Sequence, residues 1–363
     1  MRNHSKSLHR RYLFSALPLL CTLLMILAAC GGSTSPPSTN QQLASKQVLI
    51  MPNVGTQDIG VMDPAQGPDA NSSVAVGMVY SGLVKSDKDL NVMPDQATWD
   101  ASSDNKTYTF HLKPGITFSD GTPVTAQTYV YTLTRALLPK VQSPIASFFE
   151  GAIVGANDVA SGKTTVLKGV KALDDSTLQI SLNGPTPYFL EAMTNSLYFA
   201  LNKNIIDQYG QTKWVDHAAG SGVGTGPFMV KGWMHNVKMV LVPNPHYYGA
   251  KTKLTEVDMI FVQNPSTAFK SYQAGQYNFD WNIQPTDLTT AKGVSGFTIK
   301  PLLQTDLLFF SNKMAPFNHV EVRQAFAYAT DKDTLAHAVF KDAVVPAPTI
   351  IPPGMPGYQP NYK

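Results

Sequence analysis

The residue types that most often carry catalytic chemistry are scattered along this 363-residue chain. His217, His235 and His246 do not have the spacing of a metal-binding motif. The tetrapeptide SGKT at 161–164 resembles the end of a phosphate-binding loop, but Asn157 stands where that loop needs its first glycine. Neither an HExxH nor a GxSxG motif occurs. The sequence therefore favours a binding protein over an enzyme, with no catalytic residue, metal site or cofactor.

Cys30 has the clearest potential chemistry, because a cysteine thiolate is a nucleophile that can accept a lipid. It ends the tetrapeptide LAAC at 27–30, which resembles the lipobox after which bacteria cleave a precursor and lipidate the cysteine. The small residues before Cys30 suit the pocket of a signal peptidase. Cys21 precedes the cleavage point, so we expect the mature chain to contain neither a disulfide nor a free thiol.

The segment before Cys30 has the composition of an export signal. Residues 2–11 hold four basic side chains, and an apolar run without a charge continues to Ala29. The alternative is an uncleaved membrane-spanning anchor, although the run is short for a span and is interrupted by polar residues and a proline. We predict a lipoprotein signal peptide at 1–29 and a flexible tether, rich in Gly, Ser, Pro and Thr, at 30–46.

The positive charge of the chain comes from its N-terminal segment. Without the four basic residues of the predicted signal, the formal net charge falls from +3 to −1. Nothing in this balance indicates a nucleic-acid-binding surface. The 15 Tyr, 17 Phe and 4 Trp provide ample aromatic surface for a binding cleft, and the length suggests about two domains.

Periodicity and turn residues predict a mixture of strands and helices. Tyr108, Phe110 and Leu112 alternate with other residues, which is typical of a half-buried strand. Thr125 is placed to cap a helix that stops at Pro139. Residues 307–310 are apolar in succession, which indicates a strand in the middle of a sheet. Further strands are expected at 48–51, 116–118, 178–182, 228–230, 239–242 and 257–262, and further helices at 73–83, 266–275, 320–329 and 334–340. This mixture predicts an α/β fold with more than one sheet.

Six sequence blocks follow one another in the order of a known family. They are VYSGLVKSDKDLNVMPDQATWDASSDNKTYTFHLK from 79, YTFHLKPGITFSDGTPVTA at 108–126, VKALDDSTLQISLNGPTPYFL from 170, GTGPFMVKGW from 224, VLVPNPHYYG from 240 and APFNHVEVRQAFAYATDKDTL from 315. Through these blocks the chain resembles the family 5 extracellular solute-binding proteins, which include oligopeptide-, dipeptide- and nickel-binding proteins. The resemblance covers nearly all of residues 48–355.

The resemblance implies a bilobed α/β fold of the type II periplasmic-binding-protein kind with an extra inserted domain. Lobe I would be discontinuous, at 47–85 and 185–280, and the inserted small domain would occupy 86–184. Residues 281–363 would begin lobe II, which we expect to be incomplete because the relatives continue past this length. The acidic residue that pairs with a peptide's amino terminus in relatives would then lie beyond Lys363. We expect such a chain to be poorly stable, to expose apolar surface and to bind peptide weakly or not at all.

The resemblance also implies a function, that of the substrate-binding lipoprotein of an ABC importer. It would be an extracytoplasmic monomer, held at the cell membrane by lipidated Cys30, in the periplasmic space or on the cell surface. It would deliver peptides to permease subunits and their ATPase. The peptide would lie extended between the lobes and be held through its backbone, with little sequence preference.

Several segments match positions that line the ligand cleft in the family. The predicted ligand-binding residues are Tyr80, Ser81 and Gly82, the segment from Ser143 to Phe148, then Trp281, Asn282, Ile283, Thr305 and Asp306. For each of them, ordinary packing or surface exposure is the alternative. Trp281 and Asn282 are favoured because they follow the expected helix end at Gly275, where the chain should cross between lobes.

Other functions remain compatible with the sequence. Within the family, the ligand could instead be a nickel chelate, haem or an oligosaccharide. A degenerate fragment that no longer transports, or a sensor or chaperone that kept the fold, would retain the same blocks. A lipoprotein hydrolase would need a nucleophile and base that no motif in the sequence provides.

Overall fold

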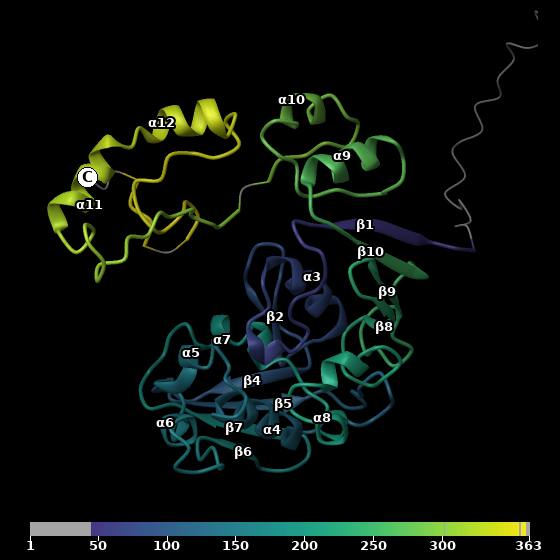
Figure 1. Ribbon diagram of the computed structural model, residues 1–363. Coiled ribbons are helices and arrows are strands. Elements are labelled where there is room, and N and C mark those ends of the chain that lie inside the picture. The colour runs from purple at the N-terminus through teal and green to yellow at the C-terminus, as the bar shows by residue number, and fades with distance from the viewer. Residues whose placement is uncertain (1–44, 301, 356, 361–363) are drawn as a thin grey trace, which may run out of the picture. The chain divides into compact units, whose positions relative to one another are not determined.

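The computed structural model describes residues 45–300, 302–355 and 357–360. These residues form two four-stranded sheets and one two-stranded sheet, with helices between the strands (Figure 1). The predictions for the signal peptide, for lipidation of Cys30 and for most of the tether lie outside the described residues. Within the described ranges, no helix is long and apolar enough to cross a membrane.

The first sheet brings together strands that are far apart in the sequence. Its order is β1 (Val48–Val54), β10 (Glu256–Val262), β9 (Lys238–Pro243) and β8 (Phe228–Met234). β1 and β10 pair in parallel, with Val48 opposite Glu256, whereas β10 and β9, and β9 and β8, pair antiparallel. Met239 and Leu241 of β9 are buried and alternate with partly exposed residues, as expected for a strand with one buried face.

One hydrophobic core lies between this sheet and three helices. The helices are α3 (Ala70–Val79), α8 (Lys203–Tyr209) and the 3₁₀ helix η4 (Trp214–His217). They contribute the fully buried Val76, Ile206 and Trp214 to the same cluster as Leu241 and Met259 of the sheet. Burial of these apolar side chains is the force that holds the helices on the sheet.

The second sheet is entirely antiparallel. Its order is β4 (Ala97–Ala101), β5 (Thr107–Leu112), β7 (Thr177–Ser181) and β6 (Val170–Ala172). α4 (Ala126–Leu137) packs on β6 and β7 and buries Tyr129, Leu133 and Leu137, which share one helix face. The backbone N–H of Thr125 donates to Thr128 Oγ1 at 3.1 Å, so the helix begins where the sequence predicts.

Shorter elements complete the described chain. β2 (Val84–Ser86) and β3 (Val92–Pro94) pair antiparallel. The buried residues of the second sheet and of α4 form a second hydrophobic core. This core also includes residues of α5 (Ser147–Glu150), α6 (Ala156–Ala160), α7 (Phe189–Ala192) and the 3₁₀ helix η3 (Ser196–Tyr198). The 3₁₀ turn η2 (Pro64–Gln66) precedes α3. Further along lie α9 (Pro265–Gln273), α10 (Leu288–Ala291), α11 (Val320–Ala329), α12 (Lys332–Thr334) and the π-helical turn η5 (Leu335–Val339).

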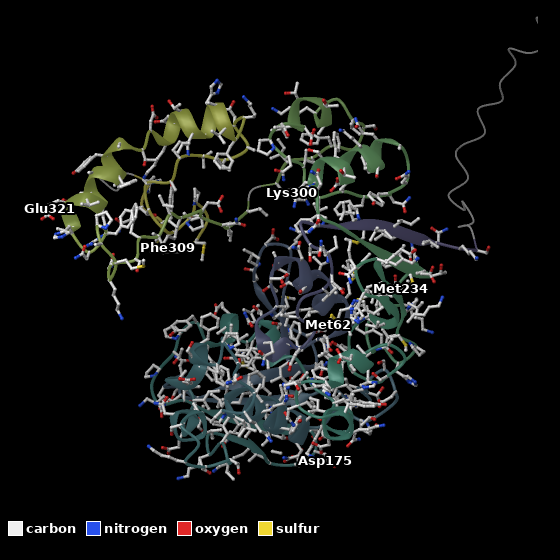
Figure 2. All side chains as sticks on the ribbon, in the orientation of Figure 1. Met62, Asp175, Met234, Lys300, Phe309 and Glu321 are labelled. Carbon is white, nitrogen blue, oxygen red and sulfur yellow. The ribbon has the colours of Figure 1, made fainter. Side chains whose placement is uncertain are left out.

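The strand predicted at 307–310 is not formed, so this prediction was wrong. Leu308 and Phe309, the latter labelled in Figure 2, are 75% and 83% exposed. A strand needs backbone donors and acceptors from a neighbour, and no described segment pairs with this one. The strand predicted at 116–118 is reduced to a single bridge between Thr117 and Pro123.

A buried ion pair joins α4 to the turn before α3. Arg135 Nη1 and Nη2 donate to Asp63 Oδ1 and Oδ2 at 3.1 and 2.6 Å. Arg135 Nε donates to Gln211 Oε1 at 2.9 Å, and the guanidinium carbon lies 5.9 Å from the centroid of the Trp214 ring. The side chains of Arg135 and Asp63 are only 1% and 8% exposed. Both charges are thus compensated where water cannot reach them.

Replacing Arg135 with alanine should destabilise the chain strongly, because Asp63 would stay buried without its cation. We expect the free energy of unfolding, measured by urea denaturation, to fall by about 3–5 kcal/mol. Lys203→Ala is the control, since it removes an exposed partner of Asp207. That variant should lose no more than about 1 kcal/mol. Similar losses in the two variants would contradict a special role for the buried pair.

Candidate functional site

A concave pocket of about 350 Å³ lies beside α3. We call it the α3 pocket, and its lining residues are Gly67, Pro68, Ser73, Val76, Gly77, Ile145, Asn195, Ser196 and Phe199. The volume is within the range of small-ligand sites, roughly 300–1,000 Å³. The lining combines apolar side chains with hydroxyl and amide groups, so the pocket can accept ligand groups of either kind.

The turn between η2 and α3 forms one wall of the α3 pocket. Asp63 caps η2, and Gly67 ends it in the left-handed conformation with a φ of 65°. A side chain at position 67 would place its Cβ 2.8 Å from Ile145 Cγ2, so both the conformation and the close approach require glycine. Asp69 then begins α3 by accepting a hydrogen bond from the Ser72 N–H at 2.8 Å.

The predicted cleft segment 143–148 lies at the rim of the α3 pocket. Ser143 Oγ donates to the carbonyl oxygen of Ala65, which ties the segment to η2. Ile145 consequently lines the pocket, whereas Phe148 is 68% exposed. Of the predicted ligand-binding segments, this one contributes a residue to the pocket lining.

Tyr80, Ser81 and Gly82 lie behind the α3 pocket and support it. Tyr80 is fully buried; burial raises its pKa well above the usual value, and the charge of Asp63 adds to the shift. Tyr80 is therefore neutral at physiological pH. A Cβ at Gly82 would lie 3.1 Å from the ring of Phe199, so the glycine gives room to a side chain of the pocket wall.

Ser81 belongs to a buried hydrogen-bond network. Its Oγ lies 2.8 Å from Thr225 Oγ1 and accepts from Gln96 Nε2 at 2.8 Å and from Tyr248 Oη at 3.0 Å. Tyr129 Oη in turn donates to Gln96 Oε1 at 2.7 Å. Burial raises the pKa of both tyrosines, so each keeps its proton and can donate. Side chains from five separate segments are thereby fixed relative to one another.

The glycine-rich loop at 222–227 packs against the end of α3. A Cβ at Gly224 would lie 2.0 Å from the carbonyl oxygen of Val79, and one at Gly226 would lie 2.6 Å from that of Met78. The Gly226 N–H also donates to the Val79 carbonyl at 2.8 Å. Only glycine permits this approach, so the loop determines where α3 and its pocket residues lie.

The remaining predicted ligand-binding residues do not line the α3 pocket. They are Trp281, which is 42% exposed, the half-buried Asn282, Ile283 and Thr305, and the exposed Asp306. Contact between these residues and a ligand stays a prediction.

Sequence reasoning missed most residues of the α3 pocket. Gly77 carried a usable signal, because an isolated glycine inside a helical pattern often has a packing or functional reason. The Gly67-Pro68 pair also carried a signal, because glycine and proline are both typical of turns. Asn195 and Phe199 carried no local signal, since only the folded chain brings them to α3.

The histidines singled out in the sequence have separate local contacts. His235 Nδ1 lies 2.7 Å from Asp58 Oδ2, and the ring of His217 stacks on Tyr209 with centroids 3.8 Å apart. In the part of the chain that the structure describes, no group of three or more His, Cys, Asp or Glu side chains could hold a metal ion.

Comparison with known proteins places this geometry in a family. Residues 91–363 match the family described as bacterial extracellular solute-binding proteins, family 5 Middle. The chain belongs to this family. Its members bind solutes and are not enzymes, which confirms the prediction of a binding protein from the sequence.

Individual relatives of this family 5 chain are similar over most of its length. Oligopeptide-binding protein OppA of Bacillus subtilis is 29% identical over 360 residues, which cover 96% of this chain and 65% of OppA. The structure of the Escherichia coli murein tripeptide binding protein MppA has a TM-score of 0.78 at 30% identity, covering 88% of this chain and 62% of MppA. Haemophilus influenzae OppA in complex with the peptide RPPGFSPFR has a TM-score of 0.75 at 26% identity, covering 88% and 64%.

These similarities confirm a mixed α/β fold of the OppA kind. The chain spans less than two thirds of the length of each of these three relatives.

Alanine at position 224 should disturb the support of the α3 pocket. Its Cβ would overlap the Val79 carbonyl oxygen, so the loop or α3 must move. We expect Gly224→Ala to lower the free energy of unfolding by about 1–3 kcal/mol. Gly77→Ala is the matched control, because no atom lies within 4 Å of a Cβ there and alanine favours a helix. If Gly224→Ala were as stable as Gly77→Ala in urea denaturation, the close packing would not be essential.

Proposed function

We propose that this chain is the solute-binding component of an ABC importer and captures peptides outside the cytoplasmic membrane. The observation that carries the proposal is its structural similarity to solute-binding proteins that hold a peptide, such as Haemophilus influenzae OppA in complex with RPPGFSPFR. The sequence similarity to OppA of Bacillus subtilis supports the same ligand class. Permease subunits with their ATPase would be the partners.

The lining of the α3 pocket supports a peptide ligand. Val76 and Phe199 offer apolar surface, while Ser73, Ser196 and Asn195 offer hydroxyl and amide groups. A site of this mixed chemistry accepts side chains of different kinds. An extended peptide that is held through its backbone can then vary in sequence, so we propose low sequence preference.

The proposal includes the bilobed organisation expected from the family. Residues 47–85 and 185–280 would form lobe I, 86–184 the inserted domain, and 281–363 the beginning of an incomplete lobe II. Two separate hydrophobic cores support the distinction between lobe I and the inserted domain. One core combines residues within 51–80 and 201–259, and the other combines Ala65 with residues within 83–200. Residues 189–200 of the proposed lobe I therefore pack in the core of the inserted domain.

The ligand should be found by calorimetry of a full-length version of this protein with mixtures of tri- to pentapeptides. We expect dissociation constants in the micromolar range, about −8 kcal/mol, because backbone pairing of a short peptide can provide this much free energy. Gly77→Leu should weaken binding by roughly tenfold or more, since its side chain would project into the α3 pocket.

Gly232→Leu provides the matched control for this variant. A Cβ at Gly232 also meets no atom within 4 Å, but Gly232 does not line the α3 pocket, so peptide affinity should be unchanged. Absence of peptide binding together with a clear signal for a nickel chelate, haem or an oligosaccharide would move the assignment to those ligands. Equal affinities of Gly77→Leu and the unaltered chain would exclude the α3 pocket as the site.

The proposal also includes a lipid anchor at Cys30, on the periplasmic or outer side of the cell membrane. Cys30→Ala should prevent lipid attachment, because alanine has no nucleophilic sulfur. We expect the variant to appear in the soluble fraction or as an unprocessed precursor, seen by cell fractionation and immunoblotting. Normal processing and full membrane retention of the variant would show that the anchor lies elsewhere.

A further inference from the structure

Asp280 lies in a segment that is attached to the free edge of the first sheet. The Asn278 N–H donates to the carbonyl oxygen of Ile50, and the Ile50 N–H donates to Asn278 Oδ1, both at 2.8 Å. β1, which contains Ile50, is an edge strand of its sheet. Asn278 thus binds both the N–H and the carbonyl oxygen of Ile50, which fixes it beside β1. Asp280 follows two residues after Asn278, so its position is tied to the same strand.

The carboxylate of Asp280 is only partly satisfied by the chain. Oδ1 accepts from the Asn282 N–H at 3.2 Å, whereas Oδ2 is enclosed and has no hydrogen-bond partner in the described part of the chain. Burial also raises the pKa of Asp280, although backbone N–H groups oppose the shift. An enclosed carboxylate oxygen without a donor is costly, so a cation that reaches this group would be bound favourably.

Two exposed aromatic side chains flank Asp280 in the sequence. Phe279 is 48% exposed and Trp281 is 42% exposed, whereas Asp280 between them is half-buried. Aromatic faces attract ammonium and guanidinium groups, with tryptophan the strongest of them. The segment therefore has one carboxylate between two exposed aromatic residues in the sequence.

We propose that Asp280 is a specificity-determining residue that binds a cationic group of the peptide, an ammonium or a guanidinium. The inference rests on the proposed peptide-binding function. The bound cation would supply the hydrogen-bond donor that Oδ2 lacks among the described residues. The cation can come from the peptide's amino terminus or from a lysine or arginine side chain.

A set of four peptides separates these two sources. An alanine pentapeptide carries either lysine or norleucine at its centre, each with a free or an acetylated amino terminus, and calorimetry measures binding to the full-length chain. We expect the peptide with the recognised cation to bind about tenfold tighter than its neutral counterpart. Asp280→Asn should remove this preference and leave the affinity for the acetylated norleucine peptide, which carries no cationic group, within about twofold.

Two further variants show whether the effect belongs to Asp280. Asp280→Glu keeps the charge and should retain part of the preference. Asp216→Asn removes the same charge at an exposed position of η4 and should leave the preference intact. Equal binding of charged and neutral peptides, or a preference that survives Asp280→Asn, would overturn the role of Asp280 while leaving the proposed function in place. Failure of all four peptides to bind would overturn the proposed function and this inference with it.

Discussion

The ion pair between Arg135 and Asp63 is the contact on which the α3 pocket depends. Asp63 is both the anion for Arg135 and the cap of η2, so one carboxylate fixes α4 and the turn that leads to Gly67. A buried charge is stable only beside its partner, so these elements cannot move independently at low cost. The guanidinium also contacts Gln211 and Trp214. Trp214 is part of the hydrophobic core under the first sheet, and Gln211 lies three residues before it. One side chain thereby links the two cores.

Buried hydrogen bonds and close backbone packing also hold the elements around the α3 pocket in place. The network around Ser81 and Gln96 pairs hydroxyl and amide groups that would each cost about 1–3 kcal/mol if they were buried alone. Gly224 and Gly226 let the backbone of their loop meet the last turn of α3 without a gap. Polar pairs and packed glycines both tolerate little displacement, which suits a binding site whose shape must exist before the ligand arrives.

Outside this rigid support, several aromatic side chains are exposed. Phe148 stands at the rim next to Ile145 of the pocket, and Trp281 flanks Asp280 in a segment fixed to β1. The proposed binding of varied peptides would gain from such a division. The preformed pocket lowers the entropic cost of binding, while exposed aromatic side chains adapt to different partners. As proposed above, Asp280 would add selectivity for a cationic group without requiring a fixed peptide sequence.

The sequence by itself determined the features that depend on neighbours along the chain. The alternation at 107–112 predicted β5, and Thr125 predicted the start of α4, because strand pleat and helix cap are local properties. Six ordered blocks were enough to identify the family, and the absence of catalytic motifs correctly favoured a binder. In the candidate site, the family resemblance led to the segment at 143–148 but not to Asn195 or Phe199.

Only the tertiary structure decided which distant residues meet. The parallel pairing of Val48 with Glu256 and the burial of Ser81 against Thr225 have no local signature, because both depend on contacts between remote segments. Residues 307–310 show the opposite case, in which a strongly apolar segment forms no strand among the described residues. Apolar side chains favour burial, but a strand also needs a neighbour that pairs with its backbone, and only the folded chain specifies that neighbour.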